Sequence, residues 1–425
     1  MKKGRCCMPS LRIAAPALSA RIDEDLLAST LARLLASGAA ASKPELVRTS
    51  GLARSTVDAG VRELLHRGVV RTQGYQQSGG RGRAAAVLEL DPSYGYVLVA
   101  DCGRHWSNLK VFDIRQHAVA EAHIQIEFSN GPDVVLEAIV AGFREILSDL
   151  PHRAVIAVIG LPAPVDHRDG SIVRPPFMPG WDRFPVIQYV SEALRCDVIL
   201  ENDVNLRALG EARASSEFSG PLLYVKVGTG IGVGIVTSDG VLMRGADGSS
   251  GEIAHLKVTG HDDICVCGSH GCLETIASVG ALTRSMTGAA PATPTTRDER
   301  DLFLRRLAEG DPEVRASVRR ADQHLGEAIA NLVHVINPHR IVLGGSLADA
   351  DEELLATVRS IVYQQALPIS TRELTLVRPA LGFDSGAAGG LVLGIERVLA
   401  PDRLMVADRD VERTEDRPRS LERER

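Results

Sequence analysis

The 425-residue sequence lacks a long uninterrupted apolar run. Its longest apolar segments, such as VVLEAIVAGF, stop well short of the ~20 consecutive residues that a membrane-spanning helix needs. The first twenty residues are basic and rich in small side chains, but they hold no continuous apolar stretch of about 7–15 residues that could form the core of a signal peptide. The sequence therefore predicts a soluble protein with no membrane partner and a cytoplasmic location.

Cysteine is also scarce, with seven residues in the chain. An odd number of cysteines spread over a long chain does not fit a disulfide framework. Three of them, Cys265, Cys267 and Cys272, stand close together in one segment. This clustering favours metal binding in a reducing compartment over disulfide formation.

The sequence has no internal repeat of solenoid length, and its composition is not that of a fibrous or collagenous chain. Apolar residues make up 44% and charged residues 24%, which is ordinary for a globular protein. At the usual ~100–200 residues per domain, the length predicts two or three domains. The last segment differs, because 15 of the 25 residues in 401–425 are charged, and we predict a disordered tail there.

Charge is distributed unevenly along the chain. Residues 1–90 carry 14 Lys and Arg against 7 Asp and Glu, a net charge of +7, whereas residues 91–425 carry 34 against 47, a net charge of -13. This asymmetry suggests a small module that binds a polyanion, attached to a larger acidic body. Chance clustering of charge is the alternative, so the local sequence pattern has to decide.

The basic segment predicts three short helices followed by two strands. Apolar residues recur at helical spacing over residues 23–37 and 53–68, and a shorter helix fits residues 42–51 with Ser42 as its cap. Two β-rich segments follow, on either side of the glycine-rich turn GGRGR. This order is typical of an α+β winged helix-turn-helix domain, which we assign to residues 20–90.

In such a domain the third helix enters the major groove of DNA. Arg54, Ser55 and Thr56 stand at the start of this helix, where they are predicted to meet base edges and phosphates. Arg81 and Arg83 in the turn would lie against the DNA backbone or in a narrow minor groove. Two alternatives stay open, because an exposed arginine is commonly only solvated and winged helices also bind proteins.

The acidic body predicts an α/β fold. Apolar runs that end in glycine or aspartate, such as RAVIAVIGL, DVILEND and LLYVKVGTG, alternate with helical segments such as 133–148 and 321–336. Two glycine-ended turns of the phosphate-binding type suggest two similar halves that face a cleft. This is the two-lobed actin-like or sugar-kinase (ribonuclease H-like) architecture, with lobes predicted at residues 91–203 and 204–400.

Four motifs make the resemblance more specific. The segment CVCGSHGCLE lies shortly after GSSGEIAHL, and both follow ENDVN and VKVGTGIGVGI. Together these motifs resemble the ROK family (repressor, open reading frame, kinase) over residues 96–400. The N-terminal winged helix resembles the branch of that family which consists of sugar-responsive transcriptional repressors.

The cysteine-rich segment contains a set of four metal-ligand side chains. Their order is His, Cys, x, Cys, four residues, Cys, and soft or borderline ligands of this kind suit tetrahedral Zn²⁺. The four ligands are His255, Cys265, Cys267 and Cys272. Because the protein fills every coordination position, the predicted metal is structural; the alternative is a loop of reduced cysteines without metal.

The resemblance also implies a sugar site made of carboxylates and amides. The implied sugar contacts are Asn202, Asp203, Glu252, His255 and Glu274. In kinases of the family, the aspartate that matches Asp203 is the general base that takes the proton from the attacking hydroxyl. An aspartate that only hydrogen-bonds the sugar is equally compatible with the sequence.

For ATP and Mg²⁺ the resemblance is weaker. The implied nucleotide residues are Asp101, Gly103, Gly228, Thr229 and Gly230. Kinases of the group have glycine and threonine where this chain has Arg104 and His105, and the larger side chains are expected to obstruct the phosphates. This argues against phosphoryl transfer.

These patterns together predict a sugar-responsive transcriptional repressor. Its winged helix binds operator DNA, and its ROK domain binds a monosaccharide or a sugar phosphate. A two-fold symmetric operator needs two DNA modules, so we predict a homodimer or homotetramer. The alternative is an ATP-dependent sugar kinase, a hexokinase, with an added DNA-binding domain. Which sugar binds, which genes are controlled and whether binding represses or activates stay undetermined by the sequence.

Overall fold

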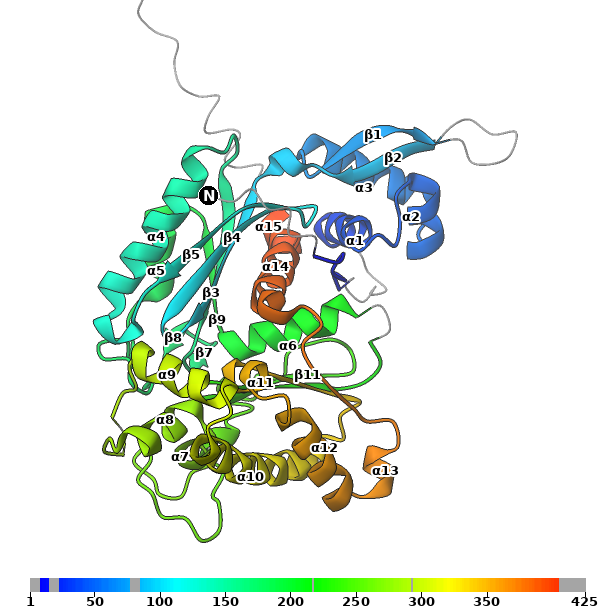
Figure 1. Cartoon of the computed structure of the whole chain (residues 1–425). Coiled ribbons are helices and arrows are strands. Elements are labelled where there is room, and N and C mark those ends of the chain that lie inside the picture. Colours follow the sequence, from blue (N-terminus) through cyan, green and yellow to red (C-terminus); the bar gives the residue numbers. More distant parts are fainter. Residues whose placement is uncertain (1–7, 15–22, 77–84, 216–217, 292, 405–425) are drawn as a thin grey trace, which may run out of the picture.

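The computed structural model describes residues 8–14, 23–76, 85–215, 218–291 and 293–404. A small N-terminal domain lies beside a larger two-lobed body, in the order in which the sequence predicts them (Figure 1). Within the described residues, no helix is both long and apolar enough to cross a membrane.

The N-terminal domain contains three helices and a two-stranded antiparallel sheet. Its elements are α1 (Glu24–Ala36), α2 (Lys43–Ser50), α3 (Arg54–His66), β1 (Val70–Gln76) and β2 (Ala85–Leu90). The side chains of Leu31, Leu46 and Leu64 are fully buried at its centre. Gly60 allows α1 and α3 to cross closely, since a Cβ there would lie 2.7 Å from Leu31. Arg81 and Arg83, predicted to contact DNA from the turn, lie outside the described residues.

The first lobe is built on a five-stranded sheet. Its strands, in sheet order, are β5 (Ala118–Gln125), β4 (Trp106–Asp113), β3 (Tyr96–Gly103), β6 (Ala154–Leu161) and β9 (Asp197–Asn202). The β3, β4 and β5 strands are antiparallel neighbours, whereas β3, β6 and β9 run parallel. Helices α4 (Pro132–Ser148) and α5 (Val186–Leu194) cover one face of this sheet (Figure 1). Parallel strands with helices on their faces place the carboxyl ends of β3, β6 and β9 at one edge, toward the second lobe.

The second lobe is built on a four-stranded sheet. Its strands, in sheet order, are β11 (Ile231–Val236), β10 (Leu222–Val227), β12 (Arg340–Gly344) and β13 (Thr375–Val377). Its helices are α7 (Glu274–Ala277), α8 (Val279–Thr287), α9 (Arg297–Ala308), α10 (Pro312–Ile336), α11 (Ser346–Ala350), α12 (Leu354–Gln365) and α13 (Pro368–Thr371). The long α10 packs against α12 over this sheet and buries Leu325, Ile329 and Val333.

Short elements complete the body. They are the strands β7 (Val165–Asp166) and β8 (Ser171–Ile172) and the 3₁₀ turns η1 (Pro92–Tyr94), η2 (Phe128–Asn130), η3 (Ile253–His255) and η4 (Gly382–Asp384).

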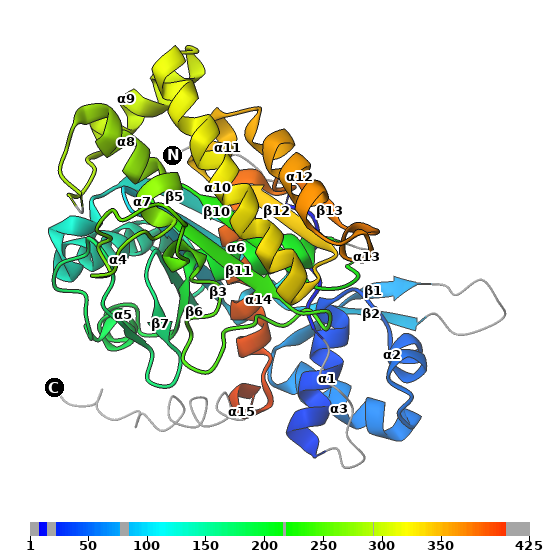
Figure 2. The same ribbon diagram turned by 90° about the horizontal axis from the view of Figure 1, so that it is seen from below.

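Two helices from distant parts of the sequence lie together at the centre of the molecule. They are α6 (Asp203–Ala214) and α14 (Ser385–Val398), and α14 covers the second face of the first-lobe sheet (Figures 1 and 2). Glycines allow their close approach, since a Cβ on Gly210 would lie 2.0 Å from the Ser385 oxygen and one on Gly389 1.9 Å from the Leu206 oxygen. The predicted range 204–400 for the second lobe therefore needs correction, because α14 belongs structurally to the first lobe.

The described chain ends in a short helix that contacts the N-terminal domain. Pro401–Leu404 forms a last helical turn, α15, although the predicted disordered tail begins at 401. Leu404 is fully buried, and its backbone oxygen accepts a hydrogen bond from Arg67 of the N-terminal domain. The prediction of a disordered tail used only the number of charged residues in 401–425, and it did not take account of the single apolar side chain, Leu404, that packs this turn against the protein. The rest of the predicted tail, residues 405–425, lies outside the described residues.

Candidate ligand cleft and metal centre

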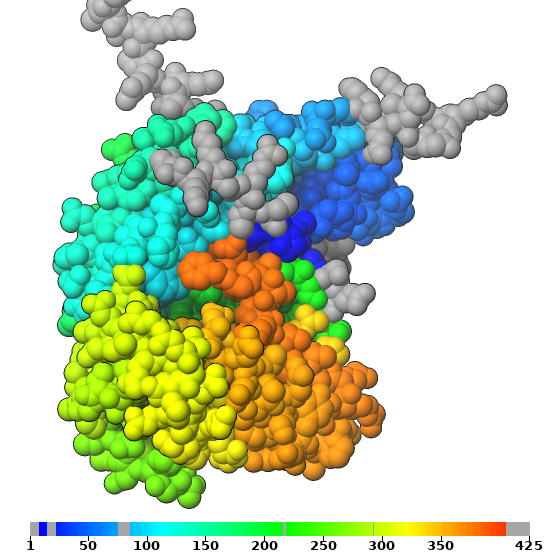
Figure 3. All heavy atoms as spheres, viewed as in Figure 1, coloured from blue at the N-terminus to red at the C-terminus, as the bar shows by residue number. Residues whose placement is uncertain are grey.

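A cleft of about 620 Å³ lies between the two lobes and takes its lining residues from both. In the space-filling view the surface is hollowed where the lobes meet (Figure 3). All five residues predicted to contact a sugar line this cleft, although the set is spread over more than seventy positions of the sequence.

Asn202 and Asp203 stand where β9 ends and α6 begins. The side-chain oxygen of Asn202 accepts hydrogen bonds from the backbone N–H groups of Val204 and Asn205, which makes it the cap of α6. Its side-chain nitrogen donates to the backbone oxygen of Ala163 at 3.1 Å. Asn202 is therefore held in one orientation at the floor of the cleft before any ligand binds.

Asp203 forms an ion pair with Lys226, which comes from β10 of the second lobe. The Asp203 side chain is 3% exposed and that of Lys226 is 20% exposed, so the pair is largely removed from solvent. A buried ion pair of this kind occupies one carboxylate oxygen and leaves the other for a ligand hydroxyl. Lys226 was not among the predicted site residues; its position directly before VGTG was the available signal.

A second carboxylate, Glu201, supports this floor from below and was also missed. It is fully buried, accepts a hydrogen bond from Asn205 at 2.9 Å, and pairs with Arg244 at 2.7 Å and His167 at 3.2 Å. Burial alone would raise the pKa of Glu201, but the hydrogen bond from His167 and the charge of Arg244 outweigh it, and the pKa lies below its ordinary value. Glu201 is thus an anion that orients the first turn of α6.

Glu252 and Glu274 face the cleft from the second lobe. Burial, together with the other carboxylates of the cleft, raises the pKa of Glu252 above its ordinary value. Burial also raises the pKa of Glu274, although its side chain accepts a hydrogen bond from the backbone N–H of Ile231 at 2.9 Å. Carboxylate oxygens gathered in this way can accept hydrogen bonds from a ligand, and the hydroxyl groups of a sugar can donate them.

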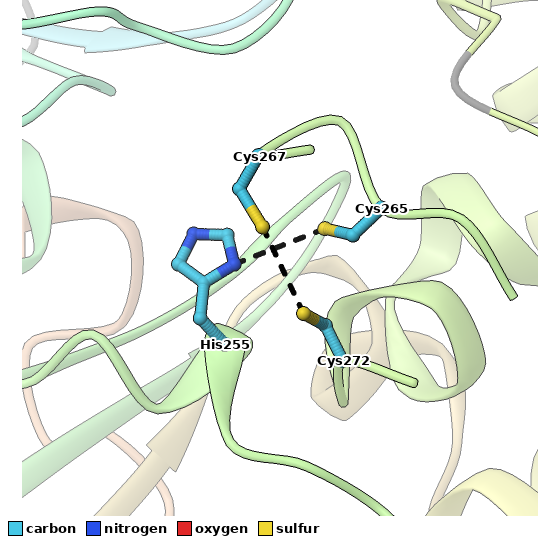
Figure 4. Close-up of side chains that lie close together, drawn as sticks. All are labelled: His255, Cys265, Cys267 and Cys272. Carbon is cyan, nitrogen blue, oxygen red and sulfur yellow. Dashed lines mark hydrogen bonds between the residues drawn. The ribbon is translucent and has the colours of Figure 1, made fainter. Parts of the chain in front are cut away.

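The four predicted metal ligands come together beside the cleft (Figure 4). One ligand atom from each residue lies within 4.8 Å of all the others. The Cys267 and Cys272 sulfurs are 3.8 Å apart, and the Cys265 sulfur is 3.8 Å from Nδ1 of His255. A tetrahedral zinc ion with Zn–S bonds near 2.3 Å requires ligand separations of about 3.8 Å. The donor types and their spacing both fit such an ion.

Two further contacts suit a metal centre of three thiolates. Lys257 Nζ lies 3.1 Å from the Cys272 sulfur and also donates to the backbone oxygen of His270 at 2.6 Å. Its positive charge balances the excess negative charge that three thiolates and one neutral imidazole leave on a divalent ion. Its role is to neutralise that charge from outside the ligand set.

His255 lies between the metal centre and the cleft. Its Nδ1 atom points toward the cysteine sulfurs, whereas the other ring nitrogen points away from them (Figure 4). His255 and Cys267 also belong to the cleft lining. The two predictions for His255, as metal ligand and as sugar contact, are therefore geometrically compatible.

The predicted phosphate turn of the first lobe is filled by side chains. Asp101 is fully buried and pairs with Arg207 of α6 at 2.7 Å. The Trp106 ring covers Gly103 so closely that a Cβ there would lie 2.6 Å from it. The guanidinium of Arg207 lies 5.9 Å from the centre of the same ring. The Trp106 ring therefore crowds the backbone of Gly103, the part of this turn that phosphate oxygens would have to approach.

The expected obstruction by His105 is wrong in its detail. His105 is 3% exposed and turns away from the cleft, with Nδ1 2.6 Å from the Glu127 carboxylate. Arg104 does line the cleft, where its guanidinium lies 4.8 Å from the centre of the Phe177 ring. Successive side chains near the β3–β4 turn point in opposite directions, and the sequence alone did not show that Arg104 rather than His105 faces the cleft.

The second glycine turn is open to the cleft. Gly228, Thr229 and Gly230 all belong to its lining. The backbone N–H of Gly228 donates to the oxygen of Gly230 at 3.0 Å, which closes the turn at the end of β10. A Cβ on Gly230 would lie 3.1 Å from the Glu274 carboxylate, so the turn and this carboxylate approach each other closely.

The described residues predicted to contact DNA lie on the first turn of α3. Arg54 and Ser55 are exposed and Thr56 is half-buried. The helix begins at Arg54 after Ala53, whose side chain cannot cap it. Asp58 of α3 pairs with Lys43 of α2 at 2.9 Å and ties the two helices together.

Comparisons with known proteins agree with this architecture. The ROK family model matches residues 97–397. The chain is 28% identical to a putative xylose repressor of Caldicellulosiruptor sp. (strain Rt8B.4) over 76% of this chain and 84% of that protein. It is 27% identical to the DNA-binding transcriptional dual regulator NagC of Escherichia coli (strain K12), over 83% of this chain and 88% of that protein.

Solved structures share the fold. A ROK family transcriptional regulator described as a homolog of the E. coli MLC protein superposes with a TM-score of 0.73 at 22% identity, covering 90% of this chain and 98% of that one. A ROK family glucokinase from Streptomyces griseus, in complex with glucose and AMPPNP, has a TM-score of 0.60 at 25% identity, with 70% and 99% of the two chains covered. The regulator covers 90% of this chain and the kinase 70%, so the match to the regulator extends further beyond the two-lobed body.

Proposed function

The chain belongs to the ROK family, and from this premise we propose that it is a sugar-responsive transcriptional repressor rather than a sugar kinase. The relatives named as putative xylose repressor and NagC match 76% and 83% of its length. Its N-terminal domain acts as a winged helix that binds operator DNA, and its cleft binds the sugar that releases the DNA.

A single observation carries the proposal: one helix connects the two sites. α6 begins in the cleft at Asp203 and ends at Ala214, a length of about 18 Å at 1.5 Å per residue. At its far end, Arg12 donates from its backbone N–H to the Arg213 oxygen at 3.0 Å and from its side chain to the Ala212 oxygen at 2.8 Å. A ligand that moves the start of α6 therefore moves the segment that contains Arg12.

That segment, residues 8–14, connects α6 to the N-terminal domain. Leu11 and Ile13 are buried in the same apolar core as α1. Ala14 donates its backbone N–H to the Glu396 carboxylate at 2.9 Å, and Glu396 also pairs with Arg213 at 3.1 Å. We call residues 8–14 the connecting segment.

α14 forms a second link along the same route. It packs on α6 near the cleft, and its far end lies beside α1. There, Arg33 donates to the Glu396 backbone oxygen at 2.7 Å and Ser29 donates to the Leu399 oxygen at 2.6 Å. Two helices thus join the cleft to the DNA-binding module, and closing the cleft changes the position of that module. Because a ligand shifts an equilibrium only through differential affinity, the sugar-bound state must fit the operator less well.

In this proposal the metal centre is a structural zinc site. His255, Cys265, Cys267 and Cys272 would hold the ion, and no coordination position would remain for a substrate. A bound zinc ion supplies the cross-link that fixes the cysteine loop against η3 and keeps the second ring nitrogen of His255 directed to the cleft.

Two features of the cleft argue against the kinase alternative. Lys226 holds one oxygen of the Asp203 carboxylate in an ion pair, so Asp203 has only its second oxygen for a ligand hydroxyl, which suits a hydrogen-bond acceptor. Arg207 and Trp106 fill the first phosphate turn, where a kinase would bring ATP and Mg²⁺. The retained Asp203 and the open Gly228–Gly230 turn are then used for ligand contacts and strand packing.

A two-step experiment tests the proposal with the full-length protein. Genomic fragments that the protein retains are sequenced to identify the operator, and operator binding is then titrated with a panel of sugars by fluorescence anisotropy. We expect one sugar or sugar phosphate to weaken operator binding at least tenfold, with a stoichiometry of two or four chains per operator. Retention of no specific DNA, together with sugar-dependent release of ADP from ATP, would establish the kinase instead.

A further inference from the structure

The cleft is larger than its cluster of sugar-type residues requires. Its volume of about 620 Å³ lies in the ~300–1,000 Å³ range of sites for drug-sized ligands. The carboxylates and amides gather around Asn202, Asp203 and Glu274, and one six-membered ring satisfies them. The remaining part of the lining has a different character and includes Trp106 and Phe383.

Trp106 and Phe383 form an aromatic pair across the mouth of the cleft. Trp106 starts β4 in the first lobe, and Phe383 lies in η4, directly before α14. Their ring centres are 4.7 Å apart at an angle of 40°. Phe383 is 52% exposed, which leaves a large apolar face open to solvent. An exposed aromatic surface on a ligand-sized cleft marks a binding surface more often than a structural one.

The charged groups beneath this pair are already matched with each other. Asp101, the acidic residue of the turn, is already neutralised by Arg207. The Trp106 ring packs over Gly103, where a Cβ would lie 2.6 Å from it, and the Arg207 guanidinium lies 5.9 Å from the centre of the same ring. A flat and uncharged group suits such a surface, since it covers the exposed rings without needing hydrogen-bond partners.

The aromatic pair adjoins the carboxylate cluster along α6. Asp203 and Arg207 are four residues apart on α6, which is a rise of about 6 Å. Arg207 also lines the cleft, and its guanidinium lies 5.9 Å from the centre of the Trp106 ring, so the aromatic pair and the carboxylate cluster meet at this residue. A group joined to the recognised sugar by a single glycosidic oxygen would reach it.

We propose that Trp106 and Phe383 form a second subsite, and that the effector is a glycoside or disaccharide whose second ring packs on this aromatic pair. The inference rests on the proposed function, because the first ring is the sugar recognised at Asp203. The aromatic pair contributes apolar contact area, and the carboxylate cluster contributes the specificity for the first ring.

The test compares matched ligands by isothermal titration calorimetry with the full-length protein. The probes are methyl and phenyl glycosides of glucose, xylose and N-acetylglucosamine in both anomers, together with the corresponding β-linked disaccharides. For the sugar that binds, we expect the phenyl glycoside or the disaccharide to bind at least tenfold more tightly than the methyl glycoside. Phe383→Ala should remove that difference and leave the affinity for the methyl glycoside within twofold. The matched control is Ile369→Ala, an equally apolar side chain that is 71% exposed outside the cleft.

Tryptophan fluorescence supplies a second readout. The chain has two tryptophans, of which Trp181 is fully buried and Trp106 lines the cleft. Binding of the larger ligand should shift the emission of wild-type protein but not that of Trp106→Phe. Equal affinities for methyl and phenyl glycosides, a Phe383→Ala variant that weakens both equally, or no glycoside binding at all would overturn the proposal, as would tighter binding of ATP that depends on Phe383. These affinities need no DNA, so a subsite found without any operator response would contradict the repressor function and not the subsite.

Discussion

Asp322 is a buried carboxyl group on α10 that faces another acidic side chain, Asp351, and no cation pairs with it among the described residues. It is 1% exposed, and burial together with the nearby Asp351 raises its pKa to about 8. Other buried acids of the body have cations or hydrogen-bond donors as partners, as Asp101 has Arg207, Glu201 has Arg244, and Glu211 has the backbone N–H groups of Ala380 and Leu381. Asp322 is therefore held in its neutral form at pH 7, because an unpaired buried charge is too costly.

This residue predicts a pH dependence of stability. The folded protein keeps the Asp322 proton up to pH 8 or so, whereas the unfolded chain releases it near pH 4, so the contribution of this group to stability falls as the pH rises between these values. Asp322→Asn keeps the shape and removes the titration. Thermal unfolding from pH 4 to 9 should show equal melting temperatures near pH 4 and a growing advantage of the variant up to pH 8. The exposed Glu352→Gln is the control; parallel curves for Asp322→Asn and wild type would contradict the prediction.

The metal centre gives a second prediction at this scale. Cys267→Ser replaces a thiolate by a neutral hydroxyl, so the zinc content should fall from one ion per chain to near zero. Elemental analysis of the purified protein measures this directly. Cys196→Ser, a substitution far from the cluster, should leave the zinc content unchanged. An unchanged metal content in Cys267→Ser would remove this residue from the ligand set.

The cleft gives a third prediction at the residue scale. Asp203→Asn keeps the shape of the side chain but loses the charge that pairs with Lys226 and accepts from the ligand. A charge-assisted hydrogen bond contributes about 1.5–3 kcal/mol, so sugar affinity should fall roughly 10-fold to 150-fold. Operator affinity without sugar should not change, because the N-terminal domain is untouched. Glu252→Gln should behave in the same direction, and calorimetry with operator-binding assays checks both. Loss of operator binding without sugar would show that Asp203 acts outside the ligand cleft.

At the scale of elements, coupling depends on α6, α14 and the connecting segment. The glycine contacts make α6 and α14 one packed unit, so they respond together to changes at the cleft. The connecting segment is attached to this unit mainly by hydrogen bonds from Arg12 and to Glu396. Polar contacts of this kind can be removed without emptying the apolar core around Leu11 and Ile13.

Arg12→Ala therefore separates transmission from binding. It removes the side-chain bond to the Ala212 oxygen at the end of α6, while the sites for sugar and DNA stay intact. We expect unchanged sugar affinity and unchanged operator affinity without sugar, but a loss of at least half of the logarithmic effect of sugar on operator binding. Anisotropy titrations with and without sugar measure this coupling. Arg372→Ala, an exposed arginine beyond α13, is the control; equal coupling in Arg12→Ala and wild type would exclude the connecting segment from the route.

For the whole molecule, the proposed binding to a two-fold symmetric operator would need the N-terminal domains of two chains in a fixed spacing. Arg54 is exposed at the start of α3, and it is the best placed of the described residues to contact a base. Arg54→Ala should cost about 1–3 kcal/mol of operator affinity and relax the preference at one position of each half-site. Selection of binding sites from random DNA tests this. If Arg54→Ala weakens binding to specific and random DNA alike, Arg54 contacts only phosphate.

The sequence by itself determined the local features. Helical spacing and end signals predicted the three helices of residues 23–68, because apolar periodicity and glycine stops are local properties of the chain. The four residues of the candidate metal site and the ROK family were also visible in the sequence, because short motifs carry their residue types at fixed spacing.

Only the tertiary structure decided what these residues face. It paired Lys226 with Asp203 and Arg207 with Asp101, and it turned His105 out of the cleft while bringing Trp106 in. It also returned α14 to the first lobe. Such relationships depend on contacts between different elements, some of them more than a hundred residues apart, as Asp101 and Arg207 are, and on side-chain directions that packing selects. No local pattern encodes them, because the free energy that fixes them comes from burial and ion pairing in the folded state.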